Sequence, residues 1–205
     1  MRIVVTRAAD QAEELVTRLE ALGHDVVRCP LIEIVPLGDE PIDPAPYDWV
    51  IVTSPNGARE LARRLAAKPA RIAAIGPGTA VELEQHGLRA DLVPRVHTQE
   101  GLRDELPAGR ALLAAAEGAR RDVLDADFVP LYRTVELRPE VPAADLALLT
   151  SGSAARALAA SGARMPVVAI GPQTAAEARK AGLDVVAVAQ NHDLDGLIEA
   201  LRECS

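Results

Sequence analysis

The chain has 205 residues, enough for one large domain or two small ones, and its 49% hydrophobic and 25% charged residues are ordinary for a folded protein. The net charge of −8 argues against nucleic acid or a membrane surface as the main partner, while a local basic patch could still hold a small anion. No apolar run reaches about 18 residues, so no membrane-spanning helix is expected. The N-terminal apolar run is too short for a signal peptide, and we expect a cytoplasmic protein.

Short apolar runs alternate with amphipathic, alanine-rich segments along the whole chain. In chain order, the predicted strands are 2–6, 25–29, 49–53, 71–75, 91–94, 110–115, 128–132, 146–150, 166–170 and 184–188. Continuous apolar runs of this length are typical of strands buried on both faces of a parallel sheet. Helices are expected between them, the first over about 9–22. This alternation predicts an α/β fold with right-handed crossovers.

The second half of the chain repeats phrases of the first half. Residues 75–88 read IGPGTAVELEQHGL and residues 170–183 read IGPQTAAEARKAGL, with eight of fourteen positions identical. Two further pairs of segments align at similar offsets, 97–106 with 192–201 and 52–62 with 149–159. Two copies of so long a period do not make a solenoid. A duplicated α/β lobe fits the pattern better.

Each lobe obtains five strands if the chain crosses between the lobes twice. Lobe one would comprise 1–34 and 137–205, and lobe two would comprise 38–131. The crossings would be 33–37 and 132–136, extended segments that we expect to pair as a two-stranded β linker. The expected fold class is therefore α/β, with two similar lobes, each a parallel five-stranded sheet with flanking helices. The alternative, a sequential split near residue 107, leaves one lobe with too few strands.

Four strand-to-helix corners share hydroxyls, small residues and free backbone N–H groups. They are 53–57 (TSPNG), 76–79 (GPGT), 150–153 (TSGS) and 171–174 (GPQT), and a further corner at 6–10 (TRAAD) adds Arg7. In parallel α/β sheets, ligands bind beyond the carboxyl ends of the strands. Because a helix N-terminus attracts carboxylate or phosphate, the corners predict a site for an anionic ligand.

Each corner taken alone has a simpler interpretation as a helix cap, because Ser, Thr and Asn cap helices while Gly and Pro make turns. The duplication favours a shared function, since capping does not require so much sequence likeness. No corner ends in Gly-Lys-Ser/Thr and none reads GxGxxG, so nucleotide binding has weak support.

Arginines and one tyrosine complete the candidate site. Arg7, Arg120, Arg121 and Arg133 lie near the same strand ends, either as solvated surface charges or as a clamp for a ligand with several negative groups. Tyr132 is one of only two tyrosines and lies in a predicted crossing segment. Its role is either packing or the donation of a phenolic proton.

The cysteines and histidines have none of the spacings that bind metals. Cys29 and Cys204 form no CxxC pair, and we interpret both as packing residues with reduced thiols. The histidines, which show no ligand spacing, are His24, His86, His97 and His192. We therefore expect no metal site.

The chain resembles the uroporphyrinogen-III synthase family over essentially its whole length. The motifs that carry the resemblance are VVTR (4–7), VTSPNGA (52–58), IGPGTA (75–80), YRTV (132–135), LTSGSA (149–154) and IGPQTA (170–175). Their order and spacing are more specific than any one motif. The resemblance implies two α/β lobes joined by two β linkers, with the active site between the lobes.

The resemblance also implies a reaction. Members of the family convert hydroxymethylbilane, a linear tetrapyrrole polycarboxylate, to uroporphyrinogen III, and they act as cyclising hydro-lyases without a cofactor. Loss of the terminal hydroxyl gives an azafulvene cation, attack at the substituted position of the last pyrrole gives a spiro intermediate, and rearrangement inverts that ring. Many helix-end donors suit a polycarboxylate, and loss of hydroxide suits one general acid. We expect positioning to contribute more than acid catalysis, because the unaided chain also closes, to the type I isomer.

By position, the resemblance assigns to Tyr132 the role of the tyrosine that assists hydroxyl loss. It assigns substrate contact to Arg7 and to the corner residues Ser54, Asn56, Thr79, Ser151, Ser153 and Thr174. One departure is the segment 117–128, which leaves at most about two helical turns where the family has a full helix. No role is therefore carried over to Arg120 or Arg121.

The expected partners are the small-molecule substrate and, transiently, the preceding enzyme of the pathway, with no nucleic acid and no membrane. We expect a monomer, since no long apolar stripe demands a partner. Two other functions remain open. One is a non-catalytic hinged protein that binds a small polyanion and has no need of Tyr132, and the other is a nucleotide-using α/β enzyme, which the missing phosphate loops disfavour.

Overall fold

The computed structural model describes residues 1–204, and the chain divides into two compact units. Unit 1 contains Met1–Glu33 and Thr134–Ser205, and unit 2 contains Ile34–Arg133. Both divisions fall within the segments that the sequence predicts to cross between lobes, 33–37 and 132–136. The exact bounds of the lobes and a hinge role for the crossings stay predictions.

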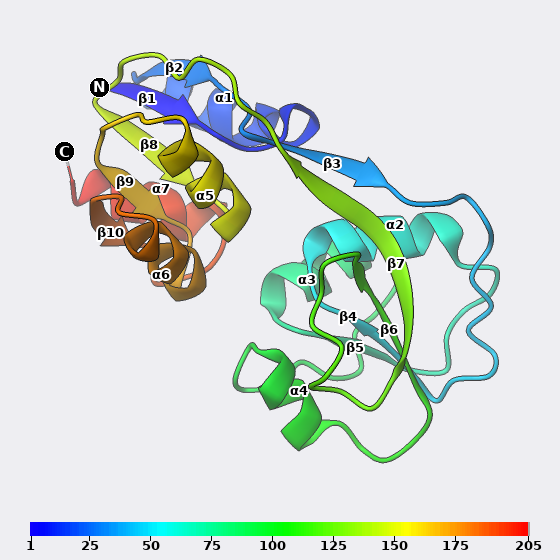
Figure 1. The fold of residues 1–205 in the computed structure, drawn as a ribbon. Helices are drawn as coiled ribbons and strands as arrows, with labels where there is room; N and C mark the ends of the chain where they lie inside the picture. Colours follow the sequence, from blue (N-terminus) through cyan, green and yellow to red (C-terminus); the bar gives the residue numbers. More distant parts are fainter. Residues whose placement is uncertain (205) are drawn as a thin grey trace. The chain divides into compact units, whose positions relative to one another are not determined.

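Unit 1 is built on a five-stranded parallel sheet with the order β10-β9-β8-β1-β2 (Figure 1). Its strands are β1 (Arg2–Val5), β2 (Asp25–Arg28), β8 (Leu146–Leu149), β9 (Val167–Ala169) and β10 (Val185–Val188). The five strands predicted for this lobe are confirmed. Ile3 and Val4, like Leu148 and Leu149, are successive residues whose side chains point to opposite faces of the sheet. All four are fully buried, so the central strands are covered on both faces.

Helices cover the sheet of unit 1. They are α1 (Glu13–Ala21), α5 (Gly152–Ala160), α6 (Pro172–Lys180) and α7 (Leu194–Arg202). Leu15 and Leu19 of α1 and Leu197 of α7 join Ile3 and Leu148 in one hydrophobic cluster, so α1 and α7 share a face of the sheet. The helix expected over about 9–22 is interrupted, because a 3-10 helix, η1 (Ala9–Gln11), precedes α1.

Unit 2 has a five-stranded sheet with the order β3-β7-β6-β4-β5. Its strands are β3 (Ile32–Pro36), β4 (Trp49–Val52), β5 (Ile72–Ala74), β6 (Ala111–Ala116) and β7 (Asp127–Glu136), and its helices are α2 (Pro55–Arg64), α3 (Pro77–Gln85) and α4 (Gln99–Glu105). Leu61 of α2 and Leu83 of α3 pack in the cluster that contains Val50 and Leu112, whereas Leu102 of α4 packs in another cluster. Helices α2 and α3 therefore cover one face of the sheet (Figure 1).

The prediction of a strand at 91–94 is wrong. Leu92 forms only an isolated parallel bridge with Ala73, because Pro94 lacks the N–H that would continue the ladder and the Asp91 carboxylate accepts the Ile72 N–H at 2.9 Å. β3 takes the fifth place in this sheet instead, at the edge beside β7.

β3 and β7 pair, as expected of the two crossing segments. The Leu37 N–H donates to the Leu131 carbonyl at 2.8 Å, and the Leu137 N–H donates to the Leu31 carbonyl at 2.8 Å. Residue numbers rise along one strand as they fall along the other, so the pair is antiparallel. The other pairs of this sheet, β4 with β5, β4 with β6 and β6 with β7, are parallel. Among the helices of residues 1–204, none is long and apolar enough to cross a membrane.

Candidate functional site

Four of the predicted corners begin helices at the carboxyl ends of strands. Ser54 caps α2 after β4, and Gly76 precedes α3 after β5. In unit 1, Ser151 caps α5 after β8, and Gly171 precedes α6 after β9. Proline follows the cap in α2, α3 and α6, where its fixed φ suits the first turn of a helix. The corner with Arg7 differs, because β1 leads into the short helix η1 before α1 begins.

In unit 2, the cap of α2 meets the predicted catalytic tyrosine. The Ser54 Oγ accepts the Gly57 N–H at 2.9 Å and lies 2.8 Å from the Tyr132 Oη. Tyr132 is only 6% exposed, and it packs in the cluster beneath α2 and α3. Two residues that are 78 positions apart in the chain thus form one hydroxyl pair.

Tyr132 is protonated at neutral pH. Burial raises the pKa of its phenol above the usual value near 10, and the hydrogen bond with Ser54 lowers the pKa by less. The phenol therefore keeps its proton at neutral pH, and it is a weaker acid than an exposed tyrosine. The Ser54 hydroxyl can in turn donate to the phenolate that forms when the proton leaves.

In unit 1, the matching serine has a different partner. The Ser151 Oγ accepts the Ala154 N–H at 3.2 Å and lies 3.1 Å from the Ser153 Oγ. Both serines are half-buried. This corner offers a pair of hydroxyls at a helix N-terminus, an arrangement that favours a carboxylate.

The remaining predicted contacts lie at the same strand ends, with different exposure. Asn56, in the first turn of α2, and Arg7, after β1, are half-buried. Thr79 in α3 and Thr174 in α6 are buried, with exposures of 3% and 7%. Contact of these four side chains with a substrate stays a prediction.

The structure gives the basic clamp residues of unit 2 other partners. Arg120 makes two hydrogen bonds to the Glu100 carboxylate, at 2.7 and 3.1 Å, and Arg121 lies over the Phe128 ring at 4.0 Å. Arg133 approaches Glu117 at 4.0 Å. The segment between β6 and β7 contains no helix, in line with the shortening seen in the sequence.

Two histidines that the sequence left unassigned lie at the corners. The His97 ring packs on Gly76 and the His192 ring packs on Gly171, so closely that an added Cβ at Gly171 would lie 3.0 Å from the ring. The sequence contains a signal for this packing, because each histidine follows its glycine at the same spacing in both copies. Within residues 1–204, no group of three or more His, Cys, Asp or Glu side chains could hold a metal ion.

Comparison with known proteins identifies the family. The family model described as uroporphyrinogen-III synthase HemD matches residues 13–199. A uroporphyrinogen-III synthase of Synechococcus elongatus is 34% identical over 54% of this chain and 48% of its own length. A putative uroporphyrinogen-III synthase of Archaeoglobus fulgidus is 28% identical over 98% of both chains. The porphyrin biosynthesis protein HemD of Ruminiclostridium josui is 28% identical over 98% of this chain and 48% of its own length.

A solved structure supports the fold. The uroporphyrinogen III synthase mutant of Thermus thermophilus superposes with a TM-score of 0.65 and 17% identity, over 99% of this chain and 98% of that chain. The chain spans about half the length of the Synechococcus elongatus and Ruminiclostridium josui relatives. Since the family model covers most of the sequence, the chain belongs to the uroporphyrinogen-III synthase family.

Proposed function

We propose that the protein is a uroporphyrinogen-III synthase, a cyclising hydro-lyase that converts hydroxymethylbilane to uroporphyrinogen III and water. The observation that carries the proposal is the buried Tyr132 phenol held 2.8 Å from the Ser54 hydroxyl at the N-terminus of α2. A protonated phenol beside a helix N-terminus brings together a proton donor and a binding site for a carboxylate.

In the proposed reaction, Tyr132 donates its proton to the terminal hydroxyl of the substrate, which leaves as water. The C–O bond breaks and an azafulvene cation remains. Attack by the substituted position of the last pyrrole forms the spiro intermediate, and rearrangement with loss of a proton gives the inverted ring. The Ser54 O–H stabilises the Tyr132 phenolate until a proton returns to it.

We propose that corner residues in each unit bind carboxylates of the substrate. In unit 2 they are Ser54, Asn56 and Thr79, and in unit 1 they are Arg7, Ser151, Ser153 and Thr174. Support comes from the four helix N-termini at strand ends, each a source of partial positive charge. Binding of this kind fixes the geometry of the substrate chain, and geometry decides which isomer forms.

The chemistry that we propose needs no cofactor, since acid catalysis and positioning are sufficient for it. We also propose that the protein acts in the cytoplasm as a monomer, in transient contact with the enzyme that supplies hydroxymethylbilane. Sedimentation of the purified protein, with and without that enzyme, tests the monomeric state and the contact between the two proteins.

The decisive experiment is an isomer assay. The purified protein is mixed with freshly made hydroxymethylbilane, the products are oxidised, and the type I and type III isomers are separated. We expect type III product in excess of the control without protein. Type I product alone, at the rate of that control, would reject the synthase and favour the non-catalytic binding protein.

A further inference from the structure

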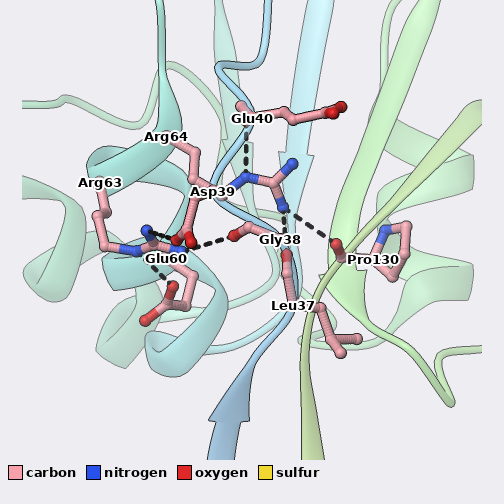
Figure 2. Close-up of polar contacts among 8 residues, drawn as sticks. All are labelled: Leu37, Gly38, Asp39, Glu40, Glu60, Arg63, Arg64 and Pro130. Carbon is pink, nitrogen blue, oxygen red and sulfur yellow. Dashed lines mark hydrogen bonds and ion pairs between the residues drawn. The ribbon is translucent and has the colours of Figure 1, made fainter.

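Arg64, the last residue of α2, is a buried cation whose hydrogen bonds go to main-chain carbonyls (Figure 2). Its Nε donates to the Glu40 carbonyl at 3.0 Å, and its Nη1 donates to the carbonyls of Leu37 at 2.7 Å and Pro130 at 3.3 Å. The residue is 9% exposed. A buried charge is costly unless it is well hydrogen-bonded, so loss of any of these three hydrogen bonds would cost free energy, and the carbonyls are held in place. The negative end of the α2 dipole stabilises the Arg64 charge further.

The Pro130 carbonyl belongs to an irregularity in β7. Ala115 of β6 pairs with Pro130, and the next residue, Ala116, pairs with Tyr132, so Leu131 is an extra residue in β7. The Leu131 carbonyl accepts a hydrogen bond from the Leu37 N–H at 2.8 Å. Arg64 therefore binds one residue of β7, Pro130, and the residue that directly follows β3, Leu37, at this bulge.

The bulge decides which face of the sheet receives Tyr132. Side chains of a regular strand alternate between faces, and one extra residue reverses the alternation beyond it. Leu131 and Tyr132 are neighbours in the chain, yet both pack in the cluster beneath α2 and α3. Without the bulge, Tyr132 would point to the opposite face, away from Ser54.

Helix α2 thus holds β7 at two places. Its first turn meets the Tyr132 phenol through Ser54, and its last residue holds the Pro130 carbonyl through Arg64. We propose that Arg64 is a positioning residue, which keeps Tyr132 on Ser54 by stabilising the bulge in β7 against the end of β3. The inference rests on the proposed synthase function, in which Tyr132 is the proton donor.

Arg63 provides a matched control on the same helix. It donates to the Gly38 carbonyl at 3.0 Å, the Asp39 carboxylate at 2.7 Å and the Glu60 carboxylate at 2.8 Å (Figure 2). It thus binds the segment that follows β3, as Arg64 does, but its hydrogen bonds do not include β7. Loss of Arg63 should loosen that segment and leave the bulge in place.

The kinetic test uses Arg64→Lys, Arg64→Met and Arg63→Met. Displacing a reacting group by a fraction of an ångström is costly, so we expect Arg64→Lys to lower kcat about tenfold with KM within about twofold. Arg63→Met should leave both constants within about twofold. Added to Tyr132→Phe, Arg64→Lys should slow turnover by less than about twofold more, because Arg64 acts through the phenol. A full tenfold loss in the Tyr132→Phe background overturns the inference.

A second readout does not depend on activity. The chain has only two tyrosines, so 3-fluorotyrosine labelling gives two ¹⁹F resonances, and Tyr47→Phe identifies that of Tyr132. We expect the Tyr132 resonance to shift in Arg64→Lys and to stay in place in Arg63→Met. An unshifted resonance in folded Arg64→Lys overturns the inference, as does failure of both Arg64 variants to fold, which assigns Arg64 to stability alone. If the wild type makes only the type I isomer, the synthase proposal fails, while the ¹⁹F comparison still decides whether Arg64 positions Tyr132.

Discussion

The two units contain the same strand-to-helix corner, but its serine has different partners. Ser54 of unit 2 lies against the Tyr132 phenol, whereas Ser151 of unit 1 lies against the Ser153 hydroxyl. In both copies the serine oxygen also caps its helix. The duplicated corner thus supplies a helix N-terminus twice, and in one copy its serine also lies against a tyrosine hydroxyl. In the function proposed above, both copies bind substrate carboxylates and one copy also donates a proton.

The copies also differ beside the shared corners. In unit 1, α1 connects the parallel strands β1 and β2. In unit 2, the parallel strands β6 and β7 occupy the corresponding places next to β4, and a loop without a helix connects them. β7 continues beyond β6 to pair with β3, and Tyr132 lies on this longer strand. The tyrosine therefore lies in the part of unit 2 that departs most from the repeat.

The largest effect on stability should come from two glycines at matching positions. A Cβ added at Gly101 of α4 would lie 2.0 Å from the Val96 carbonyl oxygen, and one at Gly196 of α7 would lie 2.1 Å from that of Asn191. We expect Gly101→Ala and Gly196→Ala each to lower the free energy of unfolding by about 3 kcal/mol. Gly78→Ala, where a Cβ meets nothing within 4 Å, is the control in a denaturant titration. A loss at only one of the two positions would show that the copies are not equivalent there.

Tyr132→Phe tests the asymmetry between the copies most directly. Removal of the proton donor should slow type III formation roughly 10- to 100-fold. The loss of stability should be about 1 kcal/mol, the usual value of one hydrogen bond. Steady-state rates and thermal unfolding measure the two quantities, with Tyr47→Phe as the control. An unchanged rate would disprove the acid role and leave positioning by the corners as the whole of catalysis.

The two serines should separate capping from catalysis. Ser54→Ala and Ser151→Ala each remove a helix cap, so both should cost about 1 kcal/mol of stability. Only Ser54→Ala also removes the partner of the phenol, and it should lower kcat by about tenfold more than Ser151→Ala does. Equal rates in the two variants would mean that the Ser54–Tyr132 contact has no part in turnover.

The smallest effect concerns an ion pair at the start of α4. Hydrogen bonds from Arg120 hold the pKa of Glu100 at about 2. In Arg120→Ala, the Glu100 pKa should rise towards its ordinary value of about 4.3, which an NMR titration of the carboxyl carbons can follow. Because the folded-state pKa is lowered, any stability from the pair is present above about pH 4 and is lost as the pH falls towards 2. A Glu100 pKa that stays near 2 would show that the first turn of α4, and not Arg120, sets its value.

The sequence predicts most of the scaffold for a physical reason. Strands buried on both faces leave continuous apolar runs, and nine of the ten predicted strands are present in the structure. The four corners that begin helices can be recognised in the sequence because each joins an apolar run to a residue that caps a helix, and because each has a counterpart in the other half of the chain. The run at 91–94 is misleading because it is short and ends at Pro94, and only Leu92 packs beside β5, without extending the ladder.

The site is less predictable, because its geometry depends on segments distant in the sequence. Ser54 and Tyr132 can each be recognised from the sequence as a candidate site residue. Their contact requires the bulge at Leu131, which no local sequence pattern predicts. Arg64 resembles an ordinary basic residue in the last turn of a helix. Its burial depends on carbonyls from two other segments, which only the folded chain brings together.

The division of the chain has a consequence for its synthesis. Unit 2 is continuous, from Ile34 to Arg133, whereas unit 1 needs both Met1–Glu33 and Thr134–Ser205. On the ribosome, the unit that carries Tyr132 can fold as soon as it has emerged, while the first strand of the other sheet, β1, must wait for β8. Strands β1 and β2, which pair with each other, therefore spend the longest time without the rest of their sheet. Early termination of translation would leave unit 2 complete and unit 1 incomplete.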